Sequence, residues 1–204
     1  MSITQDITRD APISARPLIS LKHVKYSAFA SDESLAFTAT VYVDGRFFCH
    51  VSNDGKGGDV LFDGRSGFAK RRDALDAIIA ATYPALRTSE RITACAIPAS
   101  LSLVIGDVMS AWIIVREMRS IERAHGERRL VGIVKGDLVH WKPEPRTIDR
   151  SAWCEYERGA IRHRHPGVVF WDDLTLDQRI EAVSGGGNNA TVIEAIHDFM
   201  RSRP

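Results

Sequence analysis

The sequence predicts an α+β fold, in which an antiparallel sheet built from hairpins packs against two or more helices. Two observations lead to this prediction. β-rich runs flank the turn dipeptide Asp44-Gly45, and apolar residues recur at three- and four-residue steps near residues 68–83 and 100–125. With 44% hydrophobic residues and a net charge of +1, the 204-residue chain can form one sizeable core or two small ones. This composition excludes a largely disordered chain and a collagenous chain, and three cysteines are too few for a disulfide-stapled scaffold.

We expect three segments along the chain. Residues 1–17 are polar, lack hydrophobic periodicity and contain no apolar stretch of the kind that signal peptides have, which predicts a flexible N-terminal arm. Residues 18–141 are expected to form the α+β domain. Residues 142–204 are expected to form a smaller, mainly helical part docked on it. The domain begins with an alternating segment, residues 18–29, which predicts a first strand.

The clearest local signal is a hairpin over residues 35–52. Gly45 accepts the positive φ that a two-residue turn needs, because it has no Cβ to clash. This turn sets Tyr42 opposite Phe47 and Val41 opposite Phe48. One face would then carry Phe37, Val41, Val43 and Phe48, and the other Thr38, Thr40, Tyr42, Phe47, Cys49 and Val51. Since both faces are partly apolar, we expect both to be covered; the alternative is that one of them is a contact surface that includes Tyr42 and Phe47.

Two helices are expected to pack on this sheet. The first, over residues 68–83, has an apolar stripe that includes Leu75 and Ile79, and Pro84 ends it. The second begins after residue 100 and is apolar nearly all round in its first half, so we expect it to be central. Its second half turns polar and basic, and Gly126 is a suitable stop.

The remaining segments are shorter. A second hairpin is predicted over residues 130–141, with Lys135-Gly136 or Gly136-Asp137 at its turn. Beyond Pro143 the pattern predicts a short strand at residues 168–171 and a helix that Thr175 caps. A last amphipathic helix is predicted over residues 192–200.

A glycine-rich loop after the first hairpin is the strongest candidate for a site. It consists of Asn53, Asp54, Gly55, Lys56, Gly57, Gly58 and Asp59. Closely spaced glycines let backbone N–H groups converge on an anion, as they do in phosphate-binding loops. The spacing matches neither a P-loop nor a dinucleotide fingerprint, and the carboxylates lack the spacing of a calcium loop. Three interpretations therefore stay open: a turn that reverses the chain, an anion site and a protein contact.

Arginine side chains are a second set of candidates, for contact with nucleic acid. They are Arg71, Arg72, Arg116, Arg119, Arg162 and Arg164. The last two lie near aromatic residues in the sequence, on which bases could stack. Acidic residues lie near these arginines. The default interpretation is a solvated helix face with ordinary ion pairs for Arg116 and Arg119, and a solvated basic loop for Arg162 and Arg164.

We expect neither a metal nor a cofactor. Cys154, His163 and His165 are a weak candidate set, because a His-x-His pair on a strand presents both imidazoles on one side. A fourth ligand is missing, and we recognise no motif that pairs a nucleophile with a base. The odd number of widely spaced cysteines and the absence of an apolar run of about 20 residues predict a cytoplasmic protein with no membrane span.

Several tracts carry a family resemblance. They are FASDES at residues 29–34, FTATVYVDG at 37–45, SNDGKGG at 52–58 and IGDVMSAWI at 105–113. Together they resemble a family of uncharacterised small proteins of proteobacteria, their phages and their plasmids, over roughly residues 19–141. The resemblance implies a mobile-element or accessory-genome setting. Proteins of this size and setting are often interaction proteins, including inhibitors of host defence.

We therefore expect a non-enzymatic, phage- or plasmid-associated interaction protein. It would bind a host protein or protein complex, such as a defence complex. It would modulate or inhibit this partner through the glycine-rich loop and the hairpin face. The first alternative is a nucleic-acid-associated accessory protein that uses the arginines. The second alternative is an enzyme that acts on a phosphorylated small molecule at the glycine-rich loop.

Overall fold

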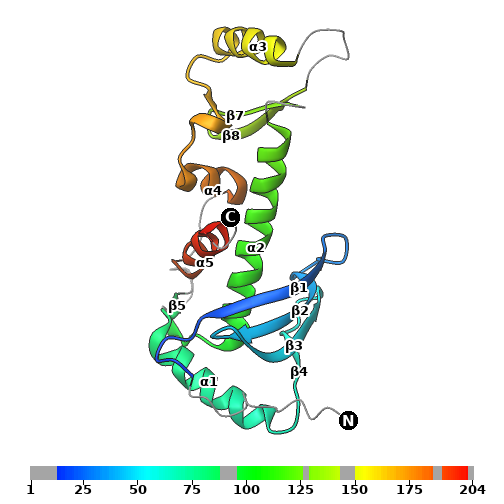
Figure 1. Ribbon diagram of the computed structural model, residues 1–204, viewed down its shortest axis with the longest axis vertical. Coiled ribbons are helices and arrows are strands. Elements are labelled where there is room, and N and C mark those ends of the chain that lie inside the picture. Colours follow the sequence, from blue (N-terminus) through cyan, green and yellow to red (C-terminus); the bar gives the residue numbers. More distant parts are fainter. Residues whose placement is uncertain (1–12, 88–95, 126–128, 143–149, 186–189, 202–204) are drawn as a thin grey trace, which may run out of the picture. The chain divides into compact units, whose positions relative to one another are not determined.

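The computed structural model describes residues 13–87, 96–125, 129–142, 150–185 and 190–201, and Figure 1 labels its elements. These residues form three antiparallel sheets and five α-helices, which confirms the predicted α+β class. The contacts group the chain into two compact units, residues 1–110 and 111–204. The division falls inside helix α2 (Leu101–Ala124), whereas the sequence suggested a boundary after residue 141.

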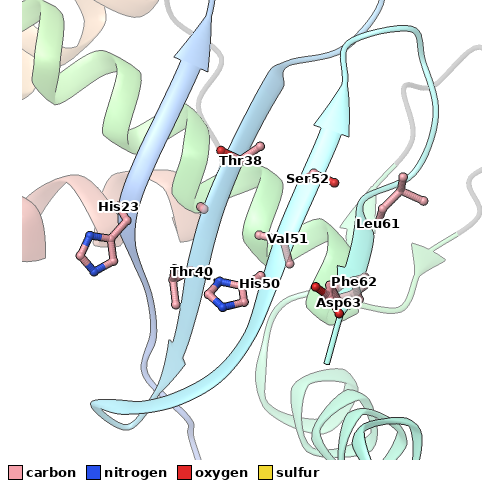
Figure 2. Close-up of a pocket in the computed structure, with 10 residues that line it drawn as sticks. His23, Thr38, Thr40, His50, Val51, Ser52, Leu61, Phe62 and Asp63 are labelled. Carbon is pink, nitrogen blue, oxygen red and sulfur yellow. Dashed lines mark hydrogen bonds between the residues drawn. The ribbon is translucent and has the colours of Figure 1, made fainter. Parts of the chain in front are cut away.

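The first unit is built around a four-stranded sheet in the order β1-β2-β3-β4. Its strands are β1 (Ile19–Ser27), β2 (Ala36–Val43), β3 (Arg46–Asp54) and β4 (Leu61–Asp63). In the view of Figure 2 the first half of α2 lies behind this sheet, and helix α1 (Phe68–Thr82) lies below the end of β4. A short ladder of β5 (Leu86–Arg87) and β6 (Ala96–Ile97) completes the unit.

Alternation along β2 decides which side of the sheet forms the core. Phe37, Ala39, Val41 and Val43 are all buried, and each is separated from the next by one residue. Leu75 and Ile79 of α1 are fully buried, as are Leu101, Ile105 and Met109 of α2. Burying a side chain of this size contributes about 1.5–3 kcal/mol relative to leaving it exposed.

The turn at Asp44-Gly45 forms as predicted, but the pairing beyond it differs. Asp44 has φ 49° and Gly45 has φ 76°, as a type I′ turn requires, and Tyr42 faces Phe47. Val41 faces Cys49 rather than Phe48, so the predicted Val41–Phe48 pair is wrong. The physical reason is a β-bulge: Phe48 is an extra residue between the two pairs, and a bulge of this kind leaves no mark in the alternation pattern.

This bulge moves two side chains to the covered side of the sheet. Cys49 is 0% exposed and Val51 is 3% exposed, although the sequence placed both on the face of Tyr42 and Phe47. Burial raises the pKa of the Cys49 thiol to about 12. Cys49 is therefore a core residue that stays protonated at neutral pH.

The side chain of Asp44 ties the N-terminal segment to the hairpin turn. Its carboxylate accepts hydrogen bonds from the amide and the hydroxyl of Ser14 (both 3.0 Å) and from the amide of Leu18 (2.9 Å). The Tyr83 hydroxyl donates to the Pro17 carbonyl (2.8 Å), and Pro17 itself is buried. The last residues of the expected flexible arm, from residue 13 onward, are thus held in place.

The second unit contains a three-stranded sheet in the order β8-β7-β9. Its strands are β7 (Leu130–Val134), β8 (Asp137–Trp141) and β9 (Val169–Phe170), and the short 3-10 helix η1 (Trp171–Asp173) follows β9. Lys135 (φ 53°) and Gly136 (φ 93°) form the turn between β7 and β8. This confirms the first of the two predicted turns.

Three helices and the second half of α2 complete this unit. They are α3 (Arg150–Arg164), α4 (Leu176–Ser184) and α5 (Ala190–Arg201). Thr175 caps α4 as predicted, and Gln178 completes a capping box with it. Helix α3 has no counterpart in the sequence prediction, because its apolar stripe is thin and charged residues crowd it. In the described ranges, no helix is both long and apolar enough to cross a bilayer.

A substitution at the hairpin turn tests the anchoring role of Asp44. Asp44→Asn keeps a residue that tolerates positive φ but removes one carboxylate oxygen, so at least one bond to Ser14 or Leu18 is lost. We expect urea unfolding at pH 7 to show a loss of about 1 kcal/mol.

The loss should depend on pH. Partial burial by itself raises the pKa of Asp44, but the hydrogen bonds from Ser14 and Leu18 and the charge of Arg46 hold it below its ordinary value. The carboxylate therefore stabilises the fold above the ordinary aspartate pKa, and this contribution is lost as the pH falls through the depressed pKa. The two proteins should converge in stability at acid pH. A difference that stays constant across the titration would contradict this role.

Candidate functional site

The uncovered face of the four-stranded sheet is the best candidate for a functional site. Directly opposed residues of an antiparallel ladder share a face, so the register places Thr38 beside Ser52, and Thr40 beside His50, away from the core. The same reasoning adds residues of β1 and β4. We call this surface the open face; it consists of Lys22, His23, Lys25, Thr38, Thr40, Tyr42, Phe47, His50, Ser52, Leu61, Asp63 and Arg65.

A hollow of about 320 Å³ opens on this face (Figure 2). All four strands line it, through His23, Thr38, Ala39, Thr40, His50, Val51, Ser52, Leu61, Phe62 and Asp63. Figure 2 shows Thr38, Thr40, His50 and Ser52 on the two central strands, between His23 on β1 and Asp63 on β4. Hydroxyl, imidazole and carboxylate groups thus surround one small space, which suits a polar ligand.

A β-bulge brings His23 to the hollow. Lys22 pairs with Thr40 and Lys25 with Thr38, so His23 and one further residue together oppose Ala39. His23 has φ 53°, which is uncommon for a residue other than glycine. Bulges re-aim side chains, and such backbone conformations concentrate at functional sites. The position of His23 is therefore a specific feature of β1 and does not follow from regular alternation.

Thr40 and His50 form the polar centre of the hollow. Thr40 is only 6% exposed, and its hydroxyl lies 3.2 Å from Nδ1 of His50. When that hydroxyl donates to Nδ1, the neutral imidazole carries its proton on Nε2 and offers it to the hollow. Asp63 lies opposite His50 in the β3–β4 register. One end of the hollow therefore combines an imidazole with a carboxylate acceptor.

Two aromatic rings, each in contact with a cationic side chain, lie beside the hollow. Tyr42 and Phe47 meet edge to face, with ring centroids 6.3 Å apart, and Phe47 lies 5.2 Å from the His50 ring. The Lys22 ammonium lies 4.5 Å from the Tyr42 centroid, and the Arg65 guanidinium lies 5.3 Å from that of Phe47. These are cation–π contacts, which keep two positive charges on the open face.

The predicted glycine-rich loop, residues 53–59, uses its polar groups within the chain. Three of its amides donate to side-chain oxygens: Gly55 to Asn53 (2.8 Å), Lys56 to Asp54 (3.1 Å) and Gly57 to Ser34 (3.1 Å). The Asn53 amide nitrogen donates in turn to the carbonyl of Gly58 (2.9 Å). Asp59 accepts from the Val60 amide (2.8 Å) and from the hydroxyl of Ser102 on α2. An anion at this loop would have to displace these acceptors from its amides.

Gly55 holds the preceding loop in place. Its carbonyl accepts the amides of Asp32 (3.1 Å), Glu33 (2.9 Å) and Ser34 (3.1 Å), and its φ is 85°. The Glu33 carboxylate lies over Gly57, since a Cβ there would be 2.4 Å from Oε2. The surroundings are thus acidic, which disfavours an anion. The geometry is that of a structural clamp, and a ligand contact at the loop stays a prediction.

The predicted arginines contact neighbours within their own units. In the first unit, the guanidinium of Arg71 lies 5.5 Å from the Phe48 ring. Arg72 lies 4.2 Å from the Phe62 ring and 3.5 Å from Asp76. In the second unit the contacts are Arg116 over Trp112 (5.5 Å), Arg119 to the Phe199 carbonyl (3.0 Å), Arg162 over Phe170 (5.3 Å) and Arg164 to Glu157 (3.5 Å).

The proposed strand geometry for the Cys154, His163 and His165 set is wrong. His163 lies in the last turn of α3, and the amide of His165 still donates to the Ile161 carbonyl (2.7 Å) in the helical pattern. Residues two apart on a helix point to nearly opposite sides, so the imidazoles do not converge. Cys154 packs against the cluster of Leu130, Ile161 and Phe170. Within the ranges that the structure covers, no group of three or more His, Cys, Asp or Glu is placed to hold a metal ion.

The second unit contains a polar network that the sequence gave no reason to expect. His125 Nδ1 accepts the Val131 amide (3.1 Å), while Nε2 lies 3.3 Å from Asp172 and 3.3 Å from Arg158. Arg158 also pairs with Asp172. Burial lowers the pKa of His125 despite the nearby Asp172 carboxylate. Since both ring nitrogens already have partners, this network joins η1 to α3 and the start of β7 and leaves no free base.

Sequence reasoning found only part of the open face. It identified Tyr42 and Phe47 as contact residues but missed Lys22, His23 and His50 as a group. The alternating Thr38, Thr40, His50 and Ser52 were a usable signal, once the hairpin turn had fixed their register. The bulge that places His23 left no such signal.

No protein-family model, curated protein or solved structure significantly matches this chain.

Two glycines of the loop give a matched test of the clamp. Gly55→Ala would place a Cβ 2.0 Å from the Ala30 carbonyl oxygen at a positive φ, whereas Gly58→Ala meets nothing within 4 Å. We expect Gly55→Ala to lose about 2–4 kcal/mol in chemical denaturation, and Gly58→Ala to stay within about 0.5 kcal/mol of the wild type. Equal stabilities of the two variants would show that the clamp contributes nothing.

Proposed function

We propose that the protein is a non-enzymatic interaction protein, associated with a phage or plasmid, that binds a host complex and modulates or inhibits it in the bacterial cytoplasm. The observation that carries this proposal is the open face, which combines a polar hollow with exposed rings and cations. The mobile-element setting comes from the family resemblance alone. The sequence predicts contact through both the glycine-rich loop and the hairpin face; the proposed surface keeps the hairpin face, with Tyr42 and Phe47, and extends it across the sheet.

The exposure of the open face supports this proposal. Phe47 is 36% exposed and Leu61 is 67% exposed, on a face that otherwise carries polar and charged side chains. The core residues of the same strands are at most 6% exposed, so, apart from Thr40 at the base of the hollow, the two faces of the sheet differ in exposure. A polar surface with a few exposed apolar residues is typical of non-obligate interfaces.

The two alternatives receive different support. A nucleic-acid-associated accessory protein is favoured by the cations on the open face rather than by the predicted arginines, whose contacts are with their own units. An enzyme acting on a phosphorylated small molecule at residues 53–59 has less support, because the loop's amides already donate within the chain.

The test is to capture a host complex from lysate with the tagged protein and with a variant in which large side chains fill the hollow. Thr38→Tyr with Ser52→Tyr puts two large rings into the hollow, and tyrosine is well tolerated in strands. Ala77→Tyr with Ala81→Tyr introduces the same two tyrosines at exposed positions of α1 and serves as the control. We expect the tagged wild type and the control to recover a host complex from lysate, and the filled variant to lose it.

Circular dichroism should first show that both variants melt as the wild type does. Recovery of the same complex by the filled variant would exclude the open face as the contact surface. Failure of the wild type to recover any complex, in lysate with or without nuclease, would contradict the proposed function itself.

A further inference from the structure

We infer that the open face binds single-stranded nucleic acid, such as the strand of a host nucleoprotein complex. The inference rests on the proposed function, because it names the class of partner for the same surface. The feature that carries it is one sheet face on which cations, aromatic rings and a hydrogen-bonding hollow lie side by side.

The charge of the open face is complementary to a phosphate backbone. Lys22, Lys25 and Arg65 contribute three positive charges to the open face as defined above, against one carboxylate, Asp63. The chain as a whole carries a net charge of only +1, so this local excess is not a consequence of composition. Lys22 and Lys25 lie on β1, and Arg65 follows β4 at the opposite edge of the sheet. A strand crossing the sheet would meet positive charge at both edges.

The rings lie where unpaired bases could stack. Phe47 is 36% exposed, and the Arg65 guanidinium lies over its ring at 5.3 Å. Bases stack on aromatic rings and on guanidinium planes alike, so Phe47 and Arg65 form a combined platform. Tyr42 and Lys22 repeat the combination of ring and cation on the neighbouring strand, at 4.5 Å. Double-stranded nucleic acid offers no free base face to such a platform.

The hollow adds groups that can read a base edge. The Thr38 and Ser52 hydroxyls both donate and accept, and the Asp63 carboxylate accepts from an N–H on a base edge, such as N3–H of thymine or uracil. The His50 ring lies 5.2 Å from Phe47, so the hydrogen-bonding groups begin where the stacking platform ends. An acidic peptide would also satisfy the three cations, but it would leave the rings and the hollow without a partner. We therefore commit to the nucleic acid, and an acidic protein becomes an outcome of the test.

The experiment measures fluorescence anisotropy of labelled oligothymidine and oligouridine of about 12 nucleotides, with a duplex of the same length for comparison. The wild type should bind the single strands more tightly than the duplex. If the three cations contact three phosphates, a plot of the logarithm of the association constant against the logarithm of the salt concentration should have a slope of about −2.

Two variants locate the binding. Lys22→Gln, Lys25→Gln and Arg65→Gln together should remove most of this slope, whereas the control Lys70→Gln, Lys142→Gln and Arg123→Gln, with the same change in charge at exposed positions, should keep it. Phe47→Leu keeps an apolar side chain but removes the stacking face, and should weaken binding about tenfold with the slope unchanged.

Three results would overturn the inference: no binding of single strands at low salt, equal binding of the duplex, or equal weakening by the control. These results are distinct from a failure of the proposed function. If the filled variant Thr38→Tyr, Ser52→Tyr loses a host complex that survives nuclease, and the wild type binds no strand, the partner is a protein and only the inference fails. If strands bind as described but no host complex is recovered, the proposed function fails and the inference stands.

Discussion

The first unit depends on one constraint: along β2, residues that face the core alternate with residues that face away from it. Its odd-numbered residues from Phe37 to Val43 are buried against the helices, so its even-numbered residues from Thr38 to Tyr42 must face the other way. Both neighbouring strands pair with β2, and each contains one bulge, next to Val41 on the β3 side and opposite Ala39 on the β1 side. The bulges let β1 and β3 keep apolar side chains in the core while they change which polar side chains reach the open face.

Near strand ends, side-chain oxygens accept hydrogen bonds from backbone amides, as main-chain carbonyls do within the sheet. Asp44 accepts three hydrogen bonds from the N-terminal segment, and Asn53 accepts from Gly55 and donates to Gly58. Asp44 directly follows β2, and Asn53 is next to the last residue of β3, so both lie near an end of the ladder, where backbone groups lose their partners. The glycine-rich loop and the Asp44 turn therefore both hold ends of the sheet through hydrogen bonds within the chain. The open face lies between these two fastened ends.

Local chemistry made much of the fold predictable. Gly45 and Gly136 occupy positions of positive φ in two-residue turns, and Thr175 caps α4, because each of these preferences acts within a few residues. Helix α3 was missed because its stability depends on the packing of a few apolar residues around Ile161, and the local sequence pattern does not indicate that packing. The bulges at His23 and Phe48 were missed for a related reason. A bulge is a property of two paired strands, and the sequence of one strand does not contain it.

The bulge in β1 also bears on how the edge of the sheet can pair with other molecules. β1 is a nine-residue strand at one edge of the described sheet, and a long regular edge is a template for adding strands from other molecules. The left-handed residue His23 interrupts its row of amides and carbonyls, and lysines stand on both sides of the interruption. The irregularity that brings an imidazole to the hollow thereby also disfavours edge-to-edge pairing with strands of other molecules, so one short segment has two structural consequences.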